Sequence, residues 1–149
     1  MEASPGPWLD DWIAGEPLPP PDAWGRPGIV MLFNVACAGC VSRAVPWLRG
    51  LAESRGDDLV LAAVHSAYGR AVWPREQVEE ALERFLAFAR LPVPVALDLD
   101  GSWARAQGAE GTPHWFAYDA HGRLLRSIFG SQANAITRLE YLVDELLAA

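Results

Sequence analysis

The stretch Cys37-Ala38-Gly39-Cys40 holds both cysteines of this chain and indicates its fold. It follows an apolar run at residues 29–33 that is typical of a buried strand, and a helical pattern begins directly after it. The first thiol is therefore expected at the N-terminus of a helix, where unpaired backbone N–H groups and the helix dipole favour a thiolate. In such motifs the pKa of a cysteine falls from about 8.5 to between roughly 3.5 and 7.5. The second thiol, one turn later, can resolve a mixed disulfide, so the pair predicts dithiol–disulfide exchange.

Three other interpretations of the cysteine pair remain open. A tetrahedral zinc site takes four ligands, and His65, His114 and His121 fall in no paired metal spacing. A structural disulfide across so short a loop would add little stability, because loop-closure entropy grows with loop length. Buried inert thiols are the third alternative, and the position between a strand and a helix disfavours them. We therefore expect no metal and no other cofactor.

The composition limits the size and the partners of the protein. The chain has 149 residues, 51% of them hydrophobic, which suits one globular domain with its own core. Its net charge of −7 offers no basic field for a phosphate backbone, so we expect no nucleic acid among its partners. All 12 basic residues are arginines, which excludes Schiff-base chemistry at a lysine.

The sequence as given shows neither a membrane span nor an export signal. No segment approaches the roughly 18–20 apolar residues that a membrane span needs, so we expect no membrane partner. Residues 1–5 lack the charged and apolar regions of a signal peptide. These features predict a cytoplasmic protein, and in that compartment a close cysteine pair is more often catalytic than structural.

The first 25 residues differ in composition from the rest of the chain. Seven of the twelve prolines lie within residues 1–27, so this stretch should be neither a helix nor a central strand. It also carries Trp8, Trp12 and Trp24, which a free tail has little reason to hold. We predict that residues 1–25 form an extended arm packed on a domain of residues 26–149. A partner-binding segment is the alternative.

Hydrophobic patterning along residues 26–149 predicts alternating strands and helices. Apolar runs mark strands buried on both faces, and Pro46 should kink the first helix because it has no backbone N–H. In chain order, the expected elements are a strand at 29–35, a helix at 38–54, a strand at 59–64, a helix at 74–90, a strand at 93–97, a short helix at 101–107, hairpin strands at 114–118 and 123–129, and a last helix capped by Ser131. This order predicts an α/β fold, a three-layer α/β/α sandwich with a mixed central sheet and the strand at 29–35 at its centre.

Four features occur in a familiar order: the cysteine pair, Pro46 in the helix, Gly111-Thr112-Pro113 ahead of the hairpin, and Gly122 in its turn. In this order they resemble the thioredoxin superfamily, and the likeness covers residues 25–147. The resemblance implies a cis Thr112–Pro113 peptide bond lying against the cysteine pair. It also implies that Thr112 and Pro113 bind substrate, with the Thr112 backbone pairing with an incoming peptide.

The stretch between Cys40 and Pro113 is longer than in plain thioredoxin and is similar to that of the TlpA/ResA-like redoxin branch. That branch carries an extra helix and strand there, which residues 66–97 would supply as a βα insertion before the cis-proline hairpin. The chain departs from thioredoxin at Ala36, where tryptophan is usual, and at Met31, which stands where thioredoxin has a buried aspartate. These departures leave the substrate and the redox direction open.

Two polar residues near the proline are candidates for tuning the pKa of the thiols. His114 shares a strand face with Thr112 if the strand is regular, so it could approach the dithiol. Glu110 is the nearest substitute for the missing proton acceptor. The alternative for His114 is a partly buried side chain that is satisfied by backbone groups.

The pattern as a whole predicts a thiol–disulfide oxidoreductase that serves cell redox homeostasis. Cys37 would attack a disulfide and Cys40 would resolve the mixed disulfide. The expected partners are protein or small-molecule thiols and disulfides and a reductase-type electron donor. A thiol peroxidase of the peroxiredoxin type is one alternative, although Asn34 stands where its signature has threonine. A thioredoxin-like binding or assembly module without turnover is the other, suggested by the tryptophan-rich arm.

Overall fold

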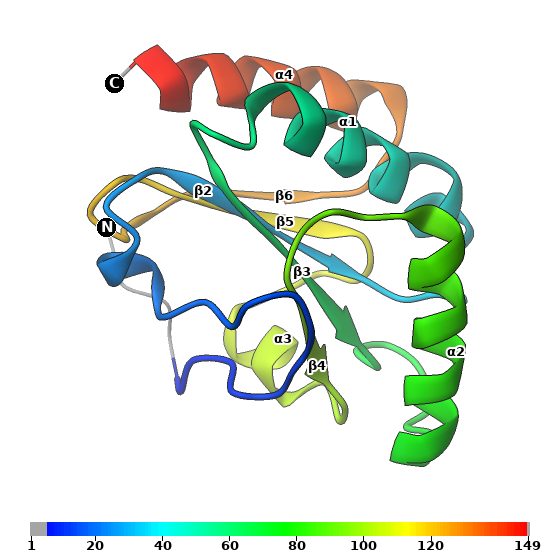
Figure 1. The fold of residues 1–149 in the computed structure, drawn as a ribbon. Coiled ribbons are helices and arrows are strands. Elements are labelled where there is room, and N and C mark those ends of the chain that lie inside the picture. Colours follow the sequence, from blue (N-terminus) through cyan, green and yellow to red (C-terminus); the bar gives the residue numbers. More distant parts are fainter. Residues whose placement is uncertain (1–5, 149) are drawn as a thin grey trace.

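The computed structural model describes residues 6–148, in which strands and helices alternate around one six-stranded sheet (Figure 1). The elements are β1 (Trp12–Ala14), η1 (Pro21–Ala23), β2 (Gly28–Phe33), η2 (Cys40–Ala44), α1 (Val45–Arg55), β3 (Val60–Ser66), α2 (Arg75–Ala89), β4 (Val95–Asp98), α3 (Ser102–Ala106), β5 (His114–Tyr118), β6 (Leu124–Phe129) and α4 (Ala133–Ala148). Residues 1–5, which bear on the expectation of no signal peptide, lie outside the described residues. Within the described part, no helix is long and apolar enough to cross a membrane, and the compartment stays a prediction.

The sheet is mixed, and β2 lies inside it, as the sequence predicts. The strand order is β1-β4-β3-β2-β5-β6. β2 pairs in parallel with β3, and β3 in parallel with β4, whereas β1, β5 and β6 are antiparallel to their neighbours. All six residues of β2 are buried, which fits an apolar strand covered on both faces. The strand ends at Phe33 rather than residue 35, because the backbone turns at Asn34 toward the cysteines.

The two faces of the sheet carry different layers, which confirms the three-layer α/β/α architecture (Figure 1). Helices α1, α2 and α4 cover one face, and their apolar residues share a hydrophobic cluster with Cys37 and Cys40. Helix α3 and the N-terminal segment cover the other face, called the second face below, where Leu9, Trp103 and Phe116 belong to one hydrophobic cluster. The insertion expected at residues 66–97 is present as α2 and β4.

The helix after the cysteines does not continue as a regular α-helix. Residues Cys40–Ala44 form a π-helical turn, in which the Val45 N–H donates to the Cys40 carbonyl, and α1 follows with Pro46 in its first turn. The expected irregularity at Pro46 therefore takes the form of a π turn just ahead of it, a feature often found at functional sites. At the C-terminal end, α4 begins at Ala133, so Ser131 lies two residues before the helix rather than directly capping it.

The N-terminal segment packs on the second face through its tryptophans. The indole N–H of Trp8 donates to the Leu18 carbonyl at 3.0 Å, and that of Trp24 donates to the Pro19 carbonyl at 2.8 Å. The Trp24 ring meets Tyr118 edge-on, with ring centroids 5.5 Å apart. Near this contact the hairpin turn comes so close that a Cβ on Gly122, whose φ is +83°, would lie 2.4 Å from the Asp22 Cα.

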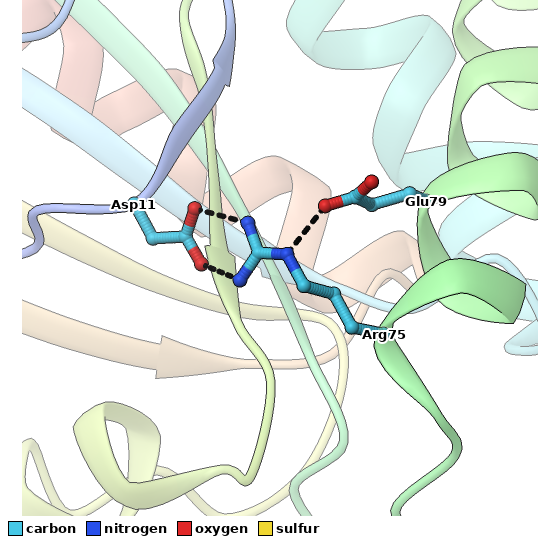
Figure 2. Close-up of polar contacts among 3 residues, drawn as sticks. All are labelled: Asp11, Arg75 and Glu79. Carbon is cyan, nitrogen blue, oxygen red and sulfur yellow. Dashed lines mark hydrogen bonds and ion pairs between the residues drawn. The ribbon is translucent and has the colours of Figure 1, made fainter.

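The N-terminal segment also adds an edge strand that the sequence does not predict. β1 pairs antiparallel with β4 and shows a register irregularity between Trp12 and Ala14. Its three residues are too few to show the alternation by which a strand is recognised in a sequence. An ion pair fixes the same segment to α2, as Figure 2 shows. The Arg75 guanidinium donates two hydrogen bonds of 2.7 Å to the Asp11 carboxylate and a third to Glu79. The arm thus contacts both the second face and α2.

Candidate active site

The two cysteines lie where the loop after β2 enters a helix. The Cys37 N–H donates to the Asn34 carbonyl at 3.0 Å, which closes the turn, and the Cys40 N–H donates to the Cys37 sulfur at 3.3 Å. Both residues are free thiols. Cys37 keeps 6% of its surface exposed and Cys40 none, so a substrate would meet Cys37 first.

The surroundings separate the pKa values of the two thiols. Burial of Cys37 opposes its ionisation, but hydrogen bonds with Cys40 and Thr112, together with the positive charge of Arg70, outweigh it and lower the pKa. Burial of Cys40, reinforced by its hydrogen bond and charge interaction with Cys37, raises the pKa of Cys40 to about 12. The pair therefore consists of one thiol prepared to ionise and one that keeps its proton.

The segment before β5 closes the site from the opposite side. The Thr112–Pro113 peptide bond is cis, as the resemblance implies. The Cys37 thiol donates to the Thr112 carbonyl, with sulfur and oxygen 3.4 Å apart. The Pro113 carbonyl accepts the Gly130 N–H at 2.9 Å and so joins this segment to the end of β6. The structure thus brings together four of the predicted site residues: Cys37, Cys40, Thr112 and Pro113.

The other two candidates, His114 and Glu110, bond to each other rather than to the cysteines. The His114 Nδ1 accepts the Glu110 N–H at 3.2 Å, its Nε2 lies 2.6 Å from the Ser127 hydroxyl, and its ring stacks on Phe116 on the second face of the sheet. Burial lowers the pKa of His114, although the charge of Glu110 opposes that effect. Among the described residues, no hydrogen bond joins either candidate to a cysteine. The expectation that His114 and Thr112 share a strand face does not hold, because side chains alternate between faces only within a strand. β5 begins at His114, so Thr112 lies outside it.

Two further residues hold the loop that delivers Cys37. The Asn34 side chain accepts the Ala36 N–H and donates to the Ser66 carbonyl, both at 2.8 Å. The His65 Nε2 accepts the Val35 N–H at 3.2 Å, and burial, aided by the nearby charge of Arg70, lowers the pKa of His65 to about 4. The sequence offered a faint signal for this arrangement, because both are polar residues at the ends of apolar strands.

Neither the cysteines nor the histidines form a metal centre. Over residues 6–148, no group of three or more histidine, cysteine, aspartate or glutamate side chains is placed to hold a metal ion.

Comparisons with known proteins show the fold. No protein-family model matches the sequence, and no curated protein matches it. Among solved structures, a thiol–disulfide isomerase from Corynebacterium glutamicum is similar at a TM-score of 0.80, with 24% identity over 100% of this chain and 96% of that one. StoA from Bacillus subtilis is similar at a TM-score of 0.72, with 19% identity over 95% of this chain and 99% of that one. An oxidised thioredoxin-like protein is similar at a TM-score of 0.79, with 21% identity over 98% and 96% of the two chains. The chain therefore has the thioredoxin-like fold.

Proposed function

We propose that the protein is a thiol–disulfide oxidoreductase that acts through Cys37 and Cys40. One observation carries the proposal: Cys37 has a lowered pKa and residual exposure, whereas Cys40 is buried behind it with a raised pKa. Nucleophilic exchange needs a thiolate that can be reached and a resolving thiol within one turn. The inserted α2 and β4, together with the likeness to StoA, support the TlpA/ResA-like redoxin branch.

The reaction proceeds in two exchanges whose atoms and electrons balance. The Cys37 thiolate attacks one sulfur of a substrate disulfide, the substrate S–S bond breaks, and one thiolate leaves. The protein then carries a mixed disulfide at Cys37. Cys40 loses its proton to the leaving thiolate or to solvent and attacks the Cys37 sulfur, which releases the second substrate thiol. The substrate gains two electrons, and the Cys37–Cys40 pair becomes a disulfide.

The residues around the pair divide this work. The Cys40 N–H stabilises charge on the Cys37 sulfur before attack. Once Cys37 is in a disulfide, its charge no longer raises the pKa of Cys40, so resolution becomes easier at that stage. We assign Thr112 and Pro113 to substrate contact, because the Thr112 carbonyl lies 3.4 Å from the Cys37 sulfur. Protein or small-molecule thiols and disulfides, with a reductase-type electron donor, are the partners we propose for this chemistry.

Reduction of insulin by dithiothreitol tests the proposal, with precipitation of the insulin chains as the readout. We expect Cys37→Ser to abolish the acceleration and Cys40→Ser to accumulate mixed disulfides that mass spectrometry locates at Cys37. Ser42→Ala is the matched control, because this exposed hydroxyl bonds only to the Ala38 carbonyl in the same helix. Full activity in Cys37→Ser would overturn the proposal. Peroxide consumption without disulfide exchange would favour the peroxidase alternative, and neither activity would favour a binding module.

A further inference from the structure

A cavity of about 630 Å³ lies beside the cysteine pair, and the function proposed above leaves it without a role. It opens where the parallel strands β2, β3 and β4 end, between those ends, the loop at residues 69–73 and the N-terminal half of α2. Residues 34–36, which lead directly into Cys37, form part of its wall. Ligands of open α/β sheets bind in the crevice outside the carboxyl ends of parallel strands, and this volume is within the range of small-molecule sites.

The cavity is lined mainly by apolar side chains, with one cation at its edge. Val35, Trp73 and Leu97 are among the apolar residues, and Arg70 is the one charged side chain in the lining. No carboxylate lines it over the described residues, although the chain has 19 acidic residues. The lining therefore combines an apolar body with a single positive charge.

Arg70 and His65 are residues of this lining with a polar side-chain group that has no partner within residues 6–148. Arg70 is exposed, and no ion pair or side-chain hydrogen bond engages its guanidinium. His65 is 5% exposed, and its Nδ1 is buried without a hydrogen-bond partner. Because Nε2 accepts the Val35 N–H, Nδ1 carries the proton of the neutral ring. Unpaired buried donors are rare in native proteins, and this one belongs to a residue that lines the cavity.

We propose that this cavity binds a low-molecular-weight disulfide that carries a carboxylate on an apolar body, with the carboxylate at Arg70 and the disulfide at Cys37. The inference rests on the proposed function and names its substrate class. Arg70 lines the cavity together with residues 34–36, which lead directly into Cys37, so a small molecule that contacts the cation lies near the loop that carries the sulfur. Exchange follows the two steps above, and the small disulfide leaves as two thiols.

The apolar wall and the cation would contribute to binding in different ways. The wall buries the body of the ligand, which favours binding in proportion to the apolar area removed from water. The guanidinium offers a carboxylate paired hydrogen bonds of fixed geometry, in which both partners carry a charge. A cationic disulfide of the same size would gain the first contribution and lose the second.

The kinetic test compares two disulfides on the intact protein. The probes are 5,5′-dithiobis(2-nitrobenzoate), which is aromatic and anionic, and bis(2-hydroxyethyl) disulfide, which is small and neutral. We expect Arg70→Gln to lower the rate with the anionic probe about tenfold relative to the rate with the neutral one. The matched control is Arg43→Gln, which removes an exposed arginine near Gly39 that does not line the cavity. If Arg70→Gln and Arg43→Gln lost the same selectivity for the anionic over the neutral disulfide, general charge attraction would explain the effect, and the proposal would be overturned.

A binding test separates this inference from the proposed function. Calorimetric titration of Cys37→Ser with 2-nitrobenzoate measures occupancy without any exchange step. We expect saturable binding that weakens about tenfold in Cys37→Ser/Arg70→Gln and is lost in Cys37→Ser/Ala81→Phe, whose larger side chain would fill the cavity from α2. Binding with this pattern supports the cavity even if the wild-type protein exchanges no disulfides. Exchange activity without such binding would overturn the inference and leave the proposed function intact.

Discussion

The two backbone segments that meet at Cys37 are each held by a buried histidine, but from opposite faces of the sheet. In the loop before Cys37, the His65 Nε2 accepts the Val35 N–H on the face that carries the cysteines. In the loop before the cis-proline, the His114 Nδ1 accepts the Glu110 N–H from the second face. Each histidine thus accepts a backbone N–H of a loop that meets Cys37, but the electrostatic surroundings of the two rings differ.

The difference lies in the second nitrogen of each ring. His114 is bonded at both nitrogens, because its Nε2 lies 2.6 Å from the Ser127 hydroxyl. The second nitrogen of His65 has no partner, and the residue lines the cavity near Arg70. Both pKa values are lowered by burial, but the shift at His65 is the larger, to about 4. Both ring nitrogens of His114 are therefore engaged away from the cysteines, whereas His65 contacts the loop before Cys37 and lines the cavity.

The largest expected effect is on the pH dependence of stability. The pKa of His65 lies at about 4 in the folded protein and about 6.5 in the unfolded chain, so between these values only the unfolded chain binds the proton. Folding stability is thus lost as the pH falls from about 6.5 to about 4, by about 3 kcal/mol in total. Urea denaturation measured across this range should show the loss.

Two variants isolate the contribution of His65 from that of the acidic residues that titrate in the same range. His65→Gln keeps an acceptor for the Val35 N–H but does not titrate, so it should lack this loss of stability. His114→Gln should retain most of it, because the shift at His114 is smaller. If the folding stability of the wild-type protein and of His65→Gln fell in parallel with pH, His65 would not cause the loss, and the distinction between the two histidines would be wrong.

Replacing each histidine by phenylalanine should have smaller effects, which rank the two residues in one order for folding stability and in the other for the reactivity of Cys37. His114→Phe loses two hydrogen bonds and should cost about 2 kcal/mol, whereas His65→Phe loses one and should cost about 1 kcal/mol. The order should reverse for the reaction of Cys37 with iodoacetamide, because only His65 holds the loop that delivers it. We expect His65→Phe to slow that reaction by up to about fivefold and His114→Phe to leave it unchanged. A slower reaction in His114→Phe alone would return that residue to the role expected from the sequence.

The sequence predicts the fold well where local patterns decide it. The apolar run of β2 and the cysteine pair after it lie where local patterns predict them. The cis Thr112–Pro113 peptide bond is expected from the resemblance to the thioredoxin superfamily rather than from a local pattern. The strand at Trp12–Ala14 escapes prediction because three residues carry too little periodicity. The π turn at Cys40–Ala44 escapes too, since a proline indicates an irregular helix without specifying its form.

The site is predicted less completely because it depends on contacts between distant segments. Cys37 and Cys40 are identified by their spacing and by their position between a strand and a helix. The hydrogen bonds of Asn34 and His65 join the loop after β2 to the end of β3 across about thirty residues of chain, and no local pattern predicts them. The placement of His114 depends on where β5 begins, which sequence patterns locate only to within a few residues.

Site-resolved alkylation tests the central claim most directly, that Cys37 is the nucleophile and Cys40 the resolving thiol. The reduced protein is treated with less than one equivalent of iodoacetamide between pH 6 and 10, and mass spectrometry measures the label at each cysteine. We expect Cys37 to react first, with a pKa below the usual range of a cysteine, and Cys40 to stay unlabelled at neutral pH because its pKa is about 12. Earlier labelling of Cys40, or equal labelling of both, would show that these roles are wrong.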